Sequence, residues 1–296
     1  MSLLSSVIRK AAPAMALAAL CASLLVGCAP KNGEAEVYAR AVPERGDDFA
    51  WENDYVFYRA YGASLETSLD FLTSPGFDVW VKNPGPIMMD KLYKDELENG
   101  LSYHNYRGLG KDCYKVSKSL GAGASSVVIA DTLRFPATNW RAYEILEQEP
   151  RKVVFVLKYP KWDVCGYTIS LDKKITVEAG THFCKAEDVY TFTGPTQELP
   201  VAAGIIRHDI RSEFKGDDRF AIWERASDQS KEPEDGMIGL GLVMPGAKAQ
   251  AIIQDHSVLM KNVRSGETLT YYFGNCWSKA DVKTDKDWFD MVKAVK

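Results

Sequence analysis

Residues 153–193 read VVFVLKYPKWDVCGYTISLDKKITVEAGTHFCKAEDVYTFT, and this segment gives the clearest indication of the fold class. Apolar residues recur in it at short intervals over Val153–Tyr159, Tyr167–Leu171, Lys174–Glu178 and Ala186–Thr193. Valine, isoleucine, tyrosine, phenylalanine and threonine fill these runs, and such side chains favour extended chain. The stretch therefore predicts successive strands joined by short turns.

The same pattern continues on both sides of this stretch, and only Pro86–Glu98 and Lys286–Val295 have helical spacing. A doubly wound α/β fold needs a helix between most strands, so it is excluded. We predict an all-β protein, a large antiparallel β-sandwich with a few short helices. The other predicted strands are Tyr55–Tyr61, Asp78–Val81, Ser126–Ala130, Trp140–Leu146, Val201–His208, Phe220–Arg225, Met237–Met244, Gln250–Leu259 and Thr268–Phe273.

The composition agrees with one globular domain. The chain has 296 residues, of which 46% are hydrophobic and 26% charged, which excludes a disordered chain and a polytopic membrane protein. No linker rich in proline, serine or glycine divides residues 37–296. We therefore predict a single sandwich domain over this range, and we expect a monomer.

The first 27 residues are typical of a secretory signal. Arg9 and Lys10 precede an apolar run over residues 14–26, which is too short to span a membrane. The run ends in LVGC at residues 25–28, which resembles a bacterial lipoprotein box in which Cys28 receives the lipid. We predict a lipid anchor at Cys28 and a tether over residues 28–36.

This interpretation places the protein in the cell envelope, anchored to the outer membrane on its periplasmic face or at the cell surface. A plain signal peptide cleaved elsewhere would also export it. After removal of residues 1–27, 34 basic and 40 acidic residues remain, a net charge of −6. Nucleic acid is therefore not an expected partner, and contact with the membrane is expected through the lipid alone.

Four cysteines follow the tether: Cys113, Cys165, Cys184 and Cys276. They contain no CxxC pair, so a zinc knuckle or a redox motif is not expected. One alternative is a disulfide between Cys165 and Cys184 on neighbouring strands. Buried free thiols are the favoured interpretation.

The densest group of polar residues is Ser102–Lys115, SYHNYRGLGKDCYK. His104, Tyr106 and Tyr114 are candidates to exchange a proton, and Arg107 and Lys115 are candidates to bind a carboxylate. Glycines in the loop permit tight turns and close approach to a ligand. The alternative is a solvated loop with an incidental histidine.

A second candidate lies in the segment WENDYVFYRAYG at residues 51–62. If Tyr55–Tyr61 is a strand, Arg59 and Tyr61 share one face with other aromatic rings, and such a face suits an acidic sugar. The alternative is an exposed arginine whose stem covers its neighbours. Asn53 belongs to the same candidate site.

Two further candidates come from the second half of the chain. His208 ends a strand-like run in the sequence Arg207-His208-Asp209, where a structural histidine is equally plausible. Trp277 closes an aromatic run that is either a stacking wall or core. No serine-hydrolase elbow, HExxH motif or P-loop occurs, and we expect no metal and no cofactor.

Several of these segments together resemble one known family. WEND at residues 51–54, YRAYG at 58–62, SYH at 102–104, GKDCYKV at 110–116 and LGAG at 120–123 are similar to the domain of unknown function 4861 family. The resemblance extends over essentially the whole chain after the signal. It implies a galactose mutarotase-like β-supersandwich and a lipidated or secreted protein of glycan-degrading Bacteroidetes.

The resemblance also implies an activity, because the family includes a dehydratase of ulvan breakdown that eliminates water from a terminal uronic acid. Such a reaction requires a neutralised carboxylate, a base and an acid for the leaving hydroxyl. Arg59 or Arg107 is the candidate neutraliser, with Lys115 sharing the carboxylate. His104, or else His208, is the candidate base, and Tyr106 or Tyr114 the candidate acid.

The expected function is thus that of a carbon-oxygen lyase acting on acidic oligosaccharides from a polysaccharide. Two alternatives stay open. One is a glycan-binding lipoprotein without catalysis. The other is an epimerase, mutarotase or hydrolase on the same scaffold, and a hydrolase would need two facing carboxylates from among Glu52, Asp54 and Asp112.

Overall fold

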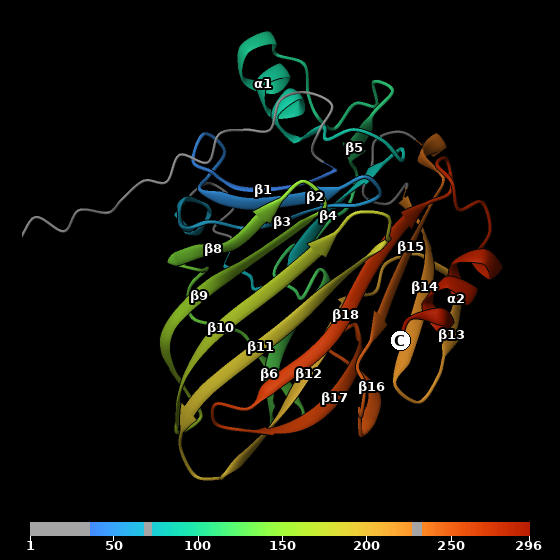
Figure 1. Ribbon diagram of the computed structural model, residues 1–296. Helices are drawn as coiled ribbons and strands as arrows, with labels where there is room; N and C mark the ends of the chain where they lie inside the picture. Colours follow the sequence, from blue (N-terminus) through green and yellow to red (C-terminus); the bar gives the residue numbers. More distant parts are fainter. Residues whose placement is uncertain (1–35, 68–72, 227–232) are drawn as a thin grey trace, which may run out of the picture.

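The computed structural model describes residues 36–67, 73–226 and 233–296. The predicted signal peptide, Cys28 and nearly all of the predicted tether lie outside the described residues. In this part of the chain the protein is built mainly of antiparallel strands, arranged in three sheets (Figure 1). The predicted all-β class and antiparallel sandwich are confirmed.

The first sheet has five strands in sequential order, and it carries the predicted loop at its edge. Each strand pairs antiparallel with the next, and the register of β4 against β5 places Trp80 opposite Asp112. The strands are β1 Val37–Val42, β2 Asp48–Asn53, β3 Phe57–Ala60, β4 Phe77–Lys82 and β5 Gly110–Asp112.

The largest sheet has eight strands in the order β13-β14-β15-β18-β11-β10-β9-β8. The strands are β8 Ala142–Glu149, β9 Lys152–Val164, β10 Tyr167–Glu178, β11 Phe183–Thr193, β13 Ile210–Lys215, β14 Arg219–Arg225, β15 Met237–Val243 and β18 Thr268–Trp277. The third sheet has the order β16-β17-β12-β6-β7, with β6 Ala122–Ile129, β7 Thr132–Arg134, β12 Glu198–Ile206, β16 Ala249–Ile253 and β17 His256–Arg264.

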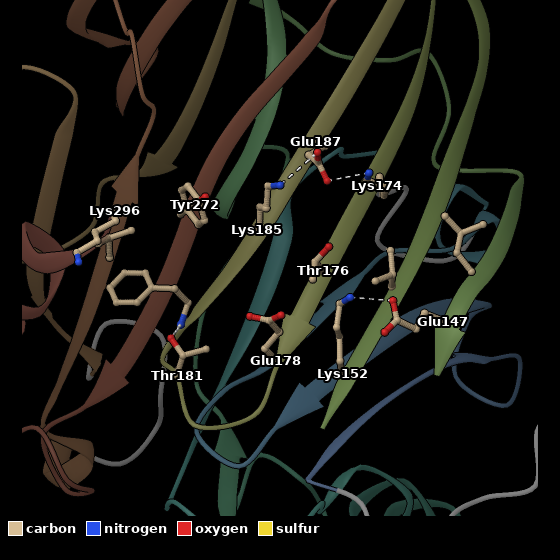
Figure 2. A pocket seen from close by; sticks show the side chains of 14 residues that line it. Glu147, Lys152, Lys174, Thr176, Glu178, Thr181, Lys185, Glu187, Tyr272 and Lys296 are labelled. Carbon is tan, nitrogen blue, oxygen red and sulfur yellow. Dashed lines mark hydrogen bonds and ion pairs between the residues drawn. The ribbon is translucent and has the colours of Figure 1, made fainter. Parts of the chain in front are cut away.

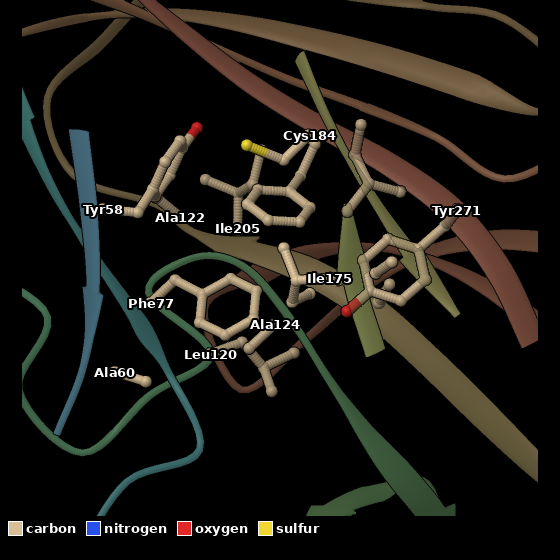
Figure 3. Packing of buried hydrophobic residues seen from close by; sticks show 14 of the residues in the cluster. Tyr58, Ala60, Phe77, Leu120, Ala122, Ala124, Ile175, Cys184, Ile205 and Tyr271 are labelled. Atoms are coloured by element: carbon tan, nitrogen blue, oxygen red, sulfur yellow. The ribbon is translucent and has the colours of Figure 1, made fainter. Parts of the chain in front are cut away.

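A single apolar core joins all three sheets (Figure 3). Along β10 the burial alternates strictly, so Ile175 and Val177 enter the core while Thr176 and Glu178 face outward. Gly123 shows how tightly the layers meet, since a Cβ built there would lie 2.6 Å from Cβ of Phe273. Only glycine permits this approach.

Helices are few and cover the outer faces of sheets. The α1 helix, Met89–Asn99, lies over the five-stranded sheet, where Leu92 and Tyr93 pack on Phe57 and Trp80. The α2 helix, Asp285–Ala294, packs on β14 and β15 through Trp288. Within the described residues, the remaining turns of helix are the 3-10 segments Ala63–Glu66 and Pro233–Asp235. No helix in the described ranges combines the length and apolar character needed to cross a membrane.

Several sequence expectations need correction. The two runs Tyr167–Leu171 and Lys174–Glu178 form one strand, and Gln250–Leu259 is a hairpin because Gln254 and Asp255 both adopt positive φ (47° and 60°). Strands β1, β2, β5, β7 and β13 were not predicted. All four cysteines after the tether are free, but Cys165 is exposed and not buried.

The predicted open face of Tyr55–Tyr61 is also wrong. Every residue of β3 is buried, because the core covers Tyr58 and Ala60 while α1 and the loop after it cover Phe57 and Arg59. The aromatic and cationic face exists, but it is a buried layer.

Candidate functional site

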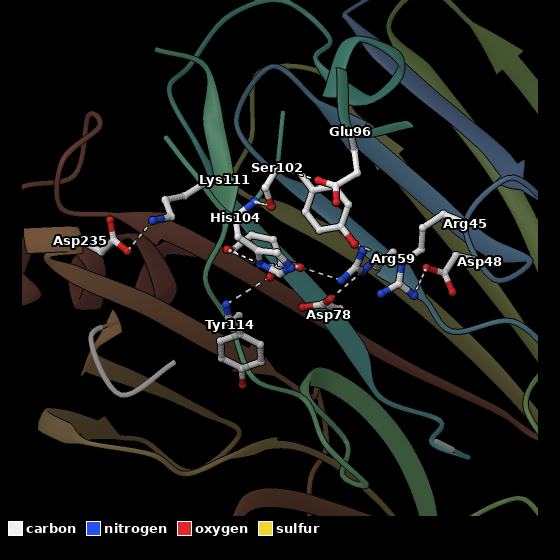
Figure 4. A network of polar contacts seen from close by, with 12 residues as sticks. Arg45, Asp48, Arg59, Asp78, Glu96, Ser102, His104, Lys111, Tyr114 and Asp235 are labelled. Carbon is white, nitrogen blue, oxygen red and sulfur yellow. Dashed lines mark hydrogen bonds and ion pairs between the residues drawn. The ribbon is translucent and has the colours of Figure 1, made fainter. Parts of the chain in front are cut away.

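The loop between α1 and β5 carries the candidate site, and a buried arginine lies beneath it (Figure 4). Nε of Arg59 donates to Oδ2 of Asp78 at 2.6 Å, and Nη2 donates to Oδ2 of Asp112 at 2.6 Å. The guanidinium also lies near the rings of Trp80 and Tyr103, at 5.0 and 5.5 Å. This ion triad fixes the position of β5 against β3 and β4.

Arg59 and Tyr61 are therefore not placed to touch a substrate, contrary to expectation. Arg59 is 3% exposed and Tyr61 7%, and the Tyr61 hydroxyl donates to Asp78 at 3.3 Å. Burial raises the pKa of Asp78 from 3.8 to about 7, with Arg59 opposing the rise and Asp112 adding to it. The network supports the loop from below.

His104 lies on top of this network, on the solvent side. Its Nδ1 lies 3.1 Å from the backbone oxygen of Asp112, and its side chain is 60% exposed. Because a carbonyl oxygen only accepts, Nδ1 is the donor in this contact, and in the neutral imidazole Nε2 then holds the lone pair. No described residue bonds Nε2. Below the imidazole, Tyr103 contacts it with ring centroids 4.7 Å apart.

The other three histidines use both ring nitrogens within the protein. His208 contacts Glu224 at 3.0 Å and the Lys115 carbonyl at 3.0 Å. His182 contacts the Asn275 carbonyl and Asp281, each at 2.9 Å. His256 accepts from the Leu120 amide at 3.0 Å, and burial lowers its pKa. His104 is the one histidine with a ring nitrogen open to solvent, so His208 does not fit the role of base.

Tyr106 is the second exposed group of the loop. It is 41% exposed, and its hydroxyl accepts from Nδ2 of Asn83 at 2.7 Å, which leaves its own proton available. Its ring lies edge-on to Trp277, with centroids 5.3 Å apart. Trp277 itself is 1% exposed and donates to the Asp235 carbonyl, so it positions Tyr106 and offers no open stacking surface.

The two cationic candidates differ in role. Arg107 donates to the Leu101 carbonyl at 3.1 Å and lies 3.7 Å from Asp95 of α1, so it holds the loop to the helix. Lys115 is exposed, and it follows the loop directly after β5.

Tyr114 and Asn53 are buried, and their contacts lie within the protein. Tyr114 is 5% exposed, and its ring packs edge-on against His208 at 5.2 Å. Asn53 is fully buried, and its side chain bonds four backbone groups: the carbonyls of residues 178 and 181 and the amides of residues 55 and 56. Neither presents an open group to a ligand.

The acidic residues considered for a hydrolase belong to separate networks. Glu52 accepts from the amides of Met88 and Met89 at the start of α1, and burial raises its pKa. Asp54 accepts from the Gly180 amide, and Asp112 is bonded to Arg59.

Sequence reasoning missed Asn83 and Asp78, because neither residue belongs to a conspicuous cluster of polar residues. Asn83 positions Tyr106, and Asp78 positions Arg59. In the described residues, no group of three metal-ligand side chains comes together.

The fold and the loop define a class, an antiparallel β-sandwich protein with an exposed histidine and tyrosine at the edge of one sheet. The chain belongs to the family named domain of unknown function 4861, whose model matches residues 28–296. It is 31% identical over 272 residues to uncharacterized protein P7 of Formosa agariphila. The match covers 86% of this chain and 66% of that relative, so the chain spans a little under two thirds of the relative's length.

Two solved structures are similar to this chain at low identity. A chain described as a kojibiose phosphorylase from the human microbiome has a TM-score of 0.45 and 9% identity, over 87% of this chain and 34% of that one. The α-galactosidase AgaB of Geobacillus stearothermophilus has a TM-score of 0.34 and 7% identity, over 82% of this chain and 41% of that one. At these TM-scores neither resemblance bears on the activity of this chain.

Proposed function

We propose that this protein is a carbohydrate-active dehydratase that eliminates water from the terminal uronic acid of an oligosaccharide. The observation that carries the proposal is the exposure and the tautomer of His104. It is the one histidine with a ring nitrogen open to solvent, and the Asp112 carbonyl fixes its tautomer so that this nitrogen holds the lone pair. The family resemblance supplies the reaction class.

The reaction divides into steps that these groups can perform. Nε2 of His104 removes the proton from the carbon next to the carboxylate. The freed electron pair forms a carbon–carbon double bond, and the hydroxyl on the neighbouring carbon departs. Tyr106 gives that hydroxyl its proton, so one water leaves and the substrate is neither oxidised nor reduced. The proton on His104 returns to Tyr106 through solvent.

Asn83 supports Tyr106 in this role. Its Nδ2 donates to the Tyr106 hydroxyl at 2.7 Å, and this bond strengthens when the phenol loses its proton. Lys115 is the proposed partner of the substrate carboxylate, because it is an exposed cation three residues after the end of β5. Withdrawing charge from that carboxylate makes the adjacent carbon-bound proton easier to remove.

A hydrolase is less well supported, because Glu52, Asp54 and Asp112 are each held in different contacts. A glycan-binding protein that performs no chemistry is the second candidate. It is favoured by the ring of Tyr106, which is 41% exposed, lies edge-on to Trp277 and can pack against a sugar. The proposal also includes a lipid anchor at Cys28, which holds the protein in the cell envelope at the outer membrane.

The experiment compares the wild-type protein with His104→Ala on a panel of uronic-acid oligosaccharides. Absorbance follows the conjugated double bond, and mass spectrometry follows the loss of one water. The proposal predicts a dehydrated product that the variant forms at least about a hundredfold more slowly. Binding of an oligosaccharide with no change in its mass would instead support the glycan-binding candidate.

A further inference from the structure

The outward face of the eight-stranded sheet contains a cavity that is separate from the His104 loop. It has a volume of about 810 Å³ and crosses β8, β9, β10, β11 and β18 (Figure 2). None of the residues assigned above to the dehydratase proposal lines it. We call it the sheet groove.

The floor of the sheet groove is a row of cross-strand neighbours. Glu147 pairs with Val154, Val154 with Thr176, Thr176 with Lys185, and Lys185 with Tyr272. With strands about 4.8 Å apart, this row extends about 19 Å across the sheet. An extended chain molecule can therefore lie along it, perpendicular to the strands.

The charged side chains of the sheet groove are paired with one another at the surface. Lys152 bonds Glu147 at 2.8 Å, Lys174 bonds Glu187 at 2.8 Å, and Lys185 lies 3.2 Å from the same Glu187. All of these side chains retain solvent contact, between 21% and 39% of their surface. Such pairs contribute little to folding, so replacing a glutamate partner by a ligand's acid group costs little stability.

The groove also offers groups for hydroxyls and ring faces. Glu178 is exposed and forms no ion pair among the described residues, so it can accept from a hydroxyl. Tyr272 and Phe183 are half-buried rings at the β18 side, and Phe183 stacks on Trp288 with planes 5° apart. Rings of this kind pack against the apolar faces of sugars.

A second cavity of about 430 Å³ continues the groove, since Thr181, Phe183 and Val295 line both. Its wall contains His182, which is 4% exposed and is held rigidly between the Asn275 carbonyl and Asp281. The groove therefore ends in a recess of mixed polar and apolar lining in which the His182 ring is held in place, unlike an ordinary solvated sheet face.

We propose that the sheet groove binds a stretch of an extended, polyhydroxylated chain carrying carboxylate or sulfate groups. Lys152, Lys174 and Lys185 exchange their glutamate partners for the acid groups, and Tyr272 packs on a ring. The groove would hold a polymer at the protein while the His104 loop acts on chain ends. This binding does not depend on the dehydratase proposal.

The test measures binding by calorimetry with three acidic probes: oligogalacturonate, alginate and chondroitin sulfate oligosaccharides of four to eight sugars, which are long enough to cover the row of about 19 Å. Neutral cello-oligosaccharides of the same length are the comparison. The double variant Lys174→Gln/Lys185→Gln should weaken binding of a recognised probe at least about tenfold, since two charged hydrogen bonds are lost. The matched control, Lys248→Gln/Lys261→Gln, removes the same charge at the third sheet and should leave binding unchanged.

His104→Ala separates the two proposals, because it should abolish turnover and leave this binding intact. If both double variants weaken binding equally, the acidic probes are attracted by charge alone, and the proposed binding in the sheet groove is overturned. The same holds if Lys174→Gln/Lys185→Gln binds like wild type, or if the wild-type protein binds none of the acidic probes saturably. Loss of turnover in His104→Ala with normal binding of the probe would support a binding site in the sheet groove that is separate from the His104 loop.

Discussion

Nδ1 of His104 lies 3.1 Å from the backbone oxygen of Asp112, and the carboxylate of that aspartate is bonded to buried Arg59. The exposed imidazole is thus oriented through a backbone group of β5, whose side chain is tied into the protein interior. A catalytic group on a loop needs such support, because small displacements of a reacting group reduce rates strongly.

The first prediction concerns His104. In His104→Asn the shorter amide side chain carries no base, and turnover of a uronic-acid oligosaccharide should fall at least about a hundredfold. Because the side chain is largely exposed, the circular dichroism spectrum and the unfolding midpoint should match wild type. Steady-state kinetics measure the effect, and wild-type kcat in this variant would remove His104 from the mechanism.

The second prediction concerns Tyr106. Tyr106→Phe retains the ring contact with Trp277 and removes the acidic proton, so kcat should fall about a hundredfold with little change in stability. Asn83→Ala should cause a smaller loss, because it removes only the bond that stabilises the phenolate. If Tyr106→Phe turns over normally, another group protonates the leaving hydroxyl.

The third prediction concerns the buried triad. Arg59→Met leaves Asp78 and Asp112 buried without their cation, which should lower the free energy of unfolding by about 3–5 kcal/mol. Urea denaturation measures this change. Arg264→Met is the control, because its pair with Glu198 is 75% exposed at the arginine and should contribute less than about 1 kcal/mol. Equal losses in the free energy of unfolding in the two variants would show that the buried triad contributes no more to stability than a surface ion pair.

The fourth prediction is a pH dependence. The pKa of Asp78 is raised from 3.8 to about 7 by burial, so the folded state holds this proton more firmly than the unfolded state. The resulting stabilisation is complete below about pH 3.8 and is lost as the pH rises through about 7. Wild type should therefore lose stability relative to Asp78→Asn between these values. A difference between the two proteins that is constant with pH would contradict the assignment.

The fifth prediction concerns the N-terminal segment. Cys28→Ser should abolish incorporation of labelled palmitate and release the protein from the membrane fraction, because the acyl chains are the proposed anchor. Fractionation of expressing cells checks both results. A serine variant that stays with the membrane would mean that another contact holds the protein there.

The fold class could be predicted because strands such as β10 alternate strictly between core and solvent along their whole length. This alternation is absent where both faces of a strand are covered by other parts of the protein. All residues of β2 and β3 are buried, so neither strand shows alternation that reveals its surroundings. Arg59 illustrates the consequence, since its place on a strand face was predictable but the helix and loop over that face were not.

The candidate site was predictable in part for a similar reason. The polar composition of the loop singled out His104 and Tyr106, and both are exposed. Sequence alone could not separate them from Tyr114 and His208, because that difference depends on contacts with residues distant in the chain. His208 is joined to Glu224 and to the carbonyl of residue 115, and only the folded chain brings these together.

Dehydration is best tested by identifying the product formed from an oligosaccharide with a terminal uronic acid, by mass and by nuclear magnetic resonance. We expect that the chain stays intact, loses one water and gains a double bond next to the carboxylate, and that His104→Asn forms this product far more slowly. A cleaved chain, or equal rates for wild type and His104→Asn, would contradict it.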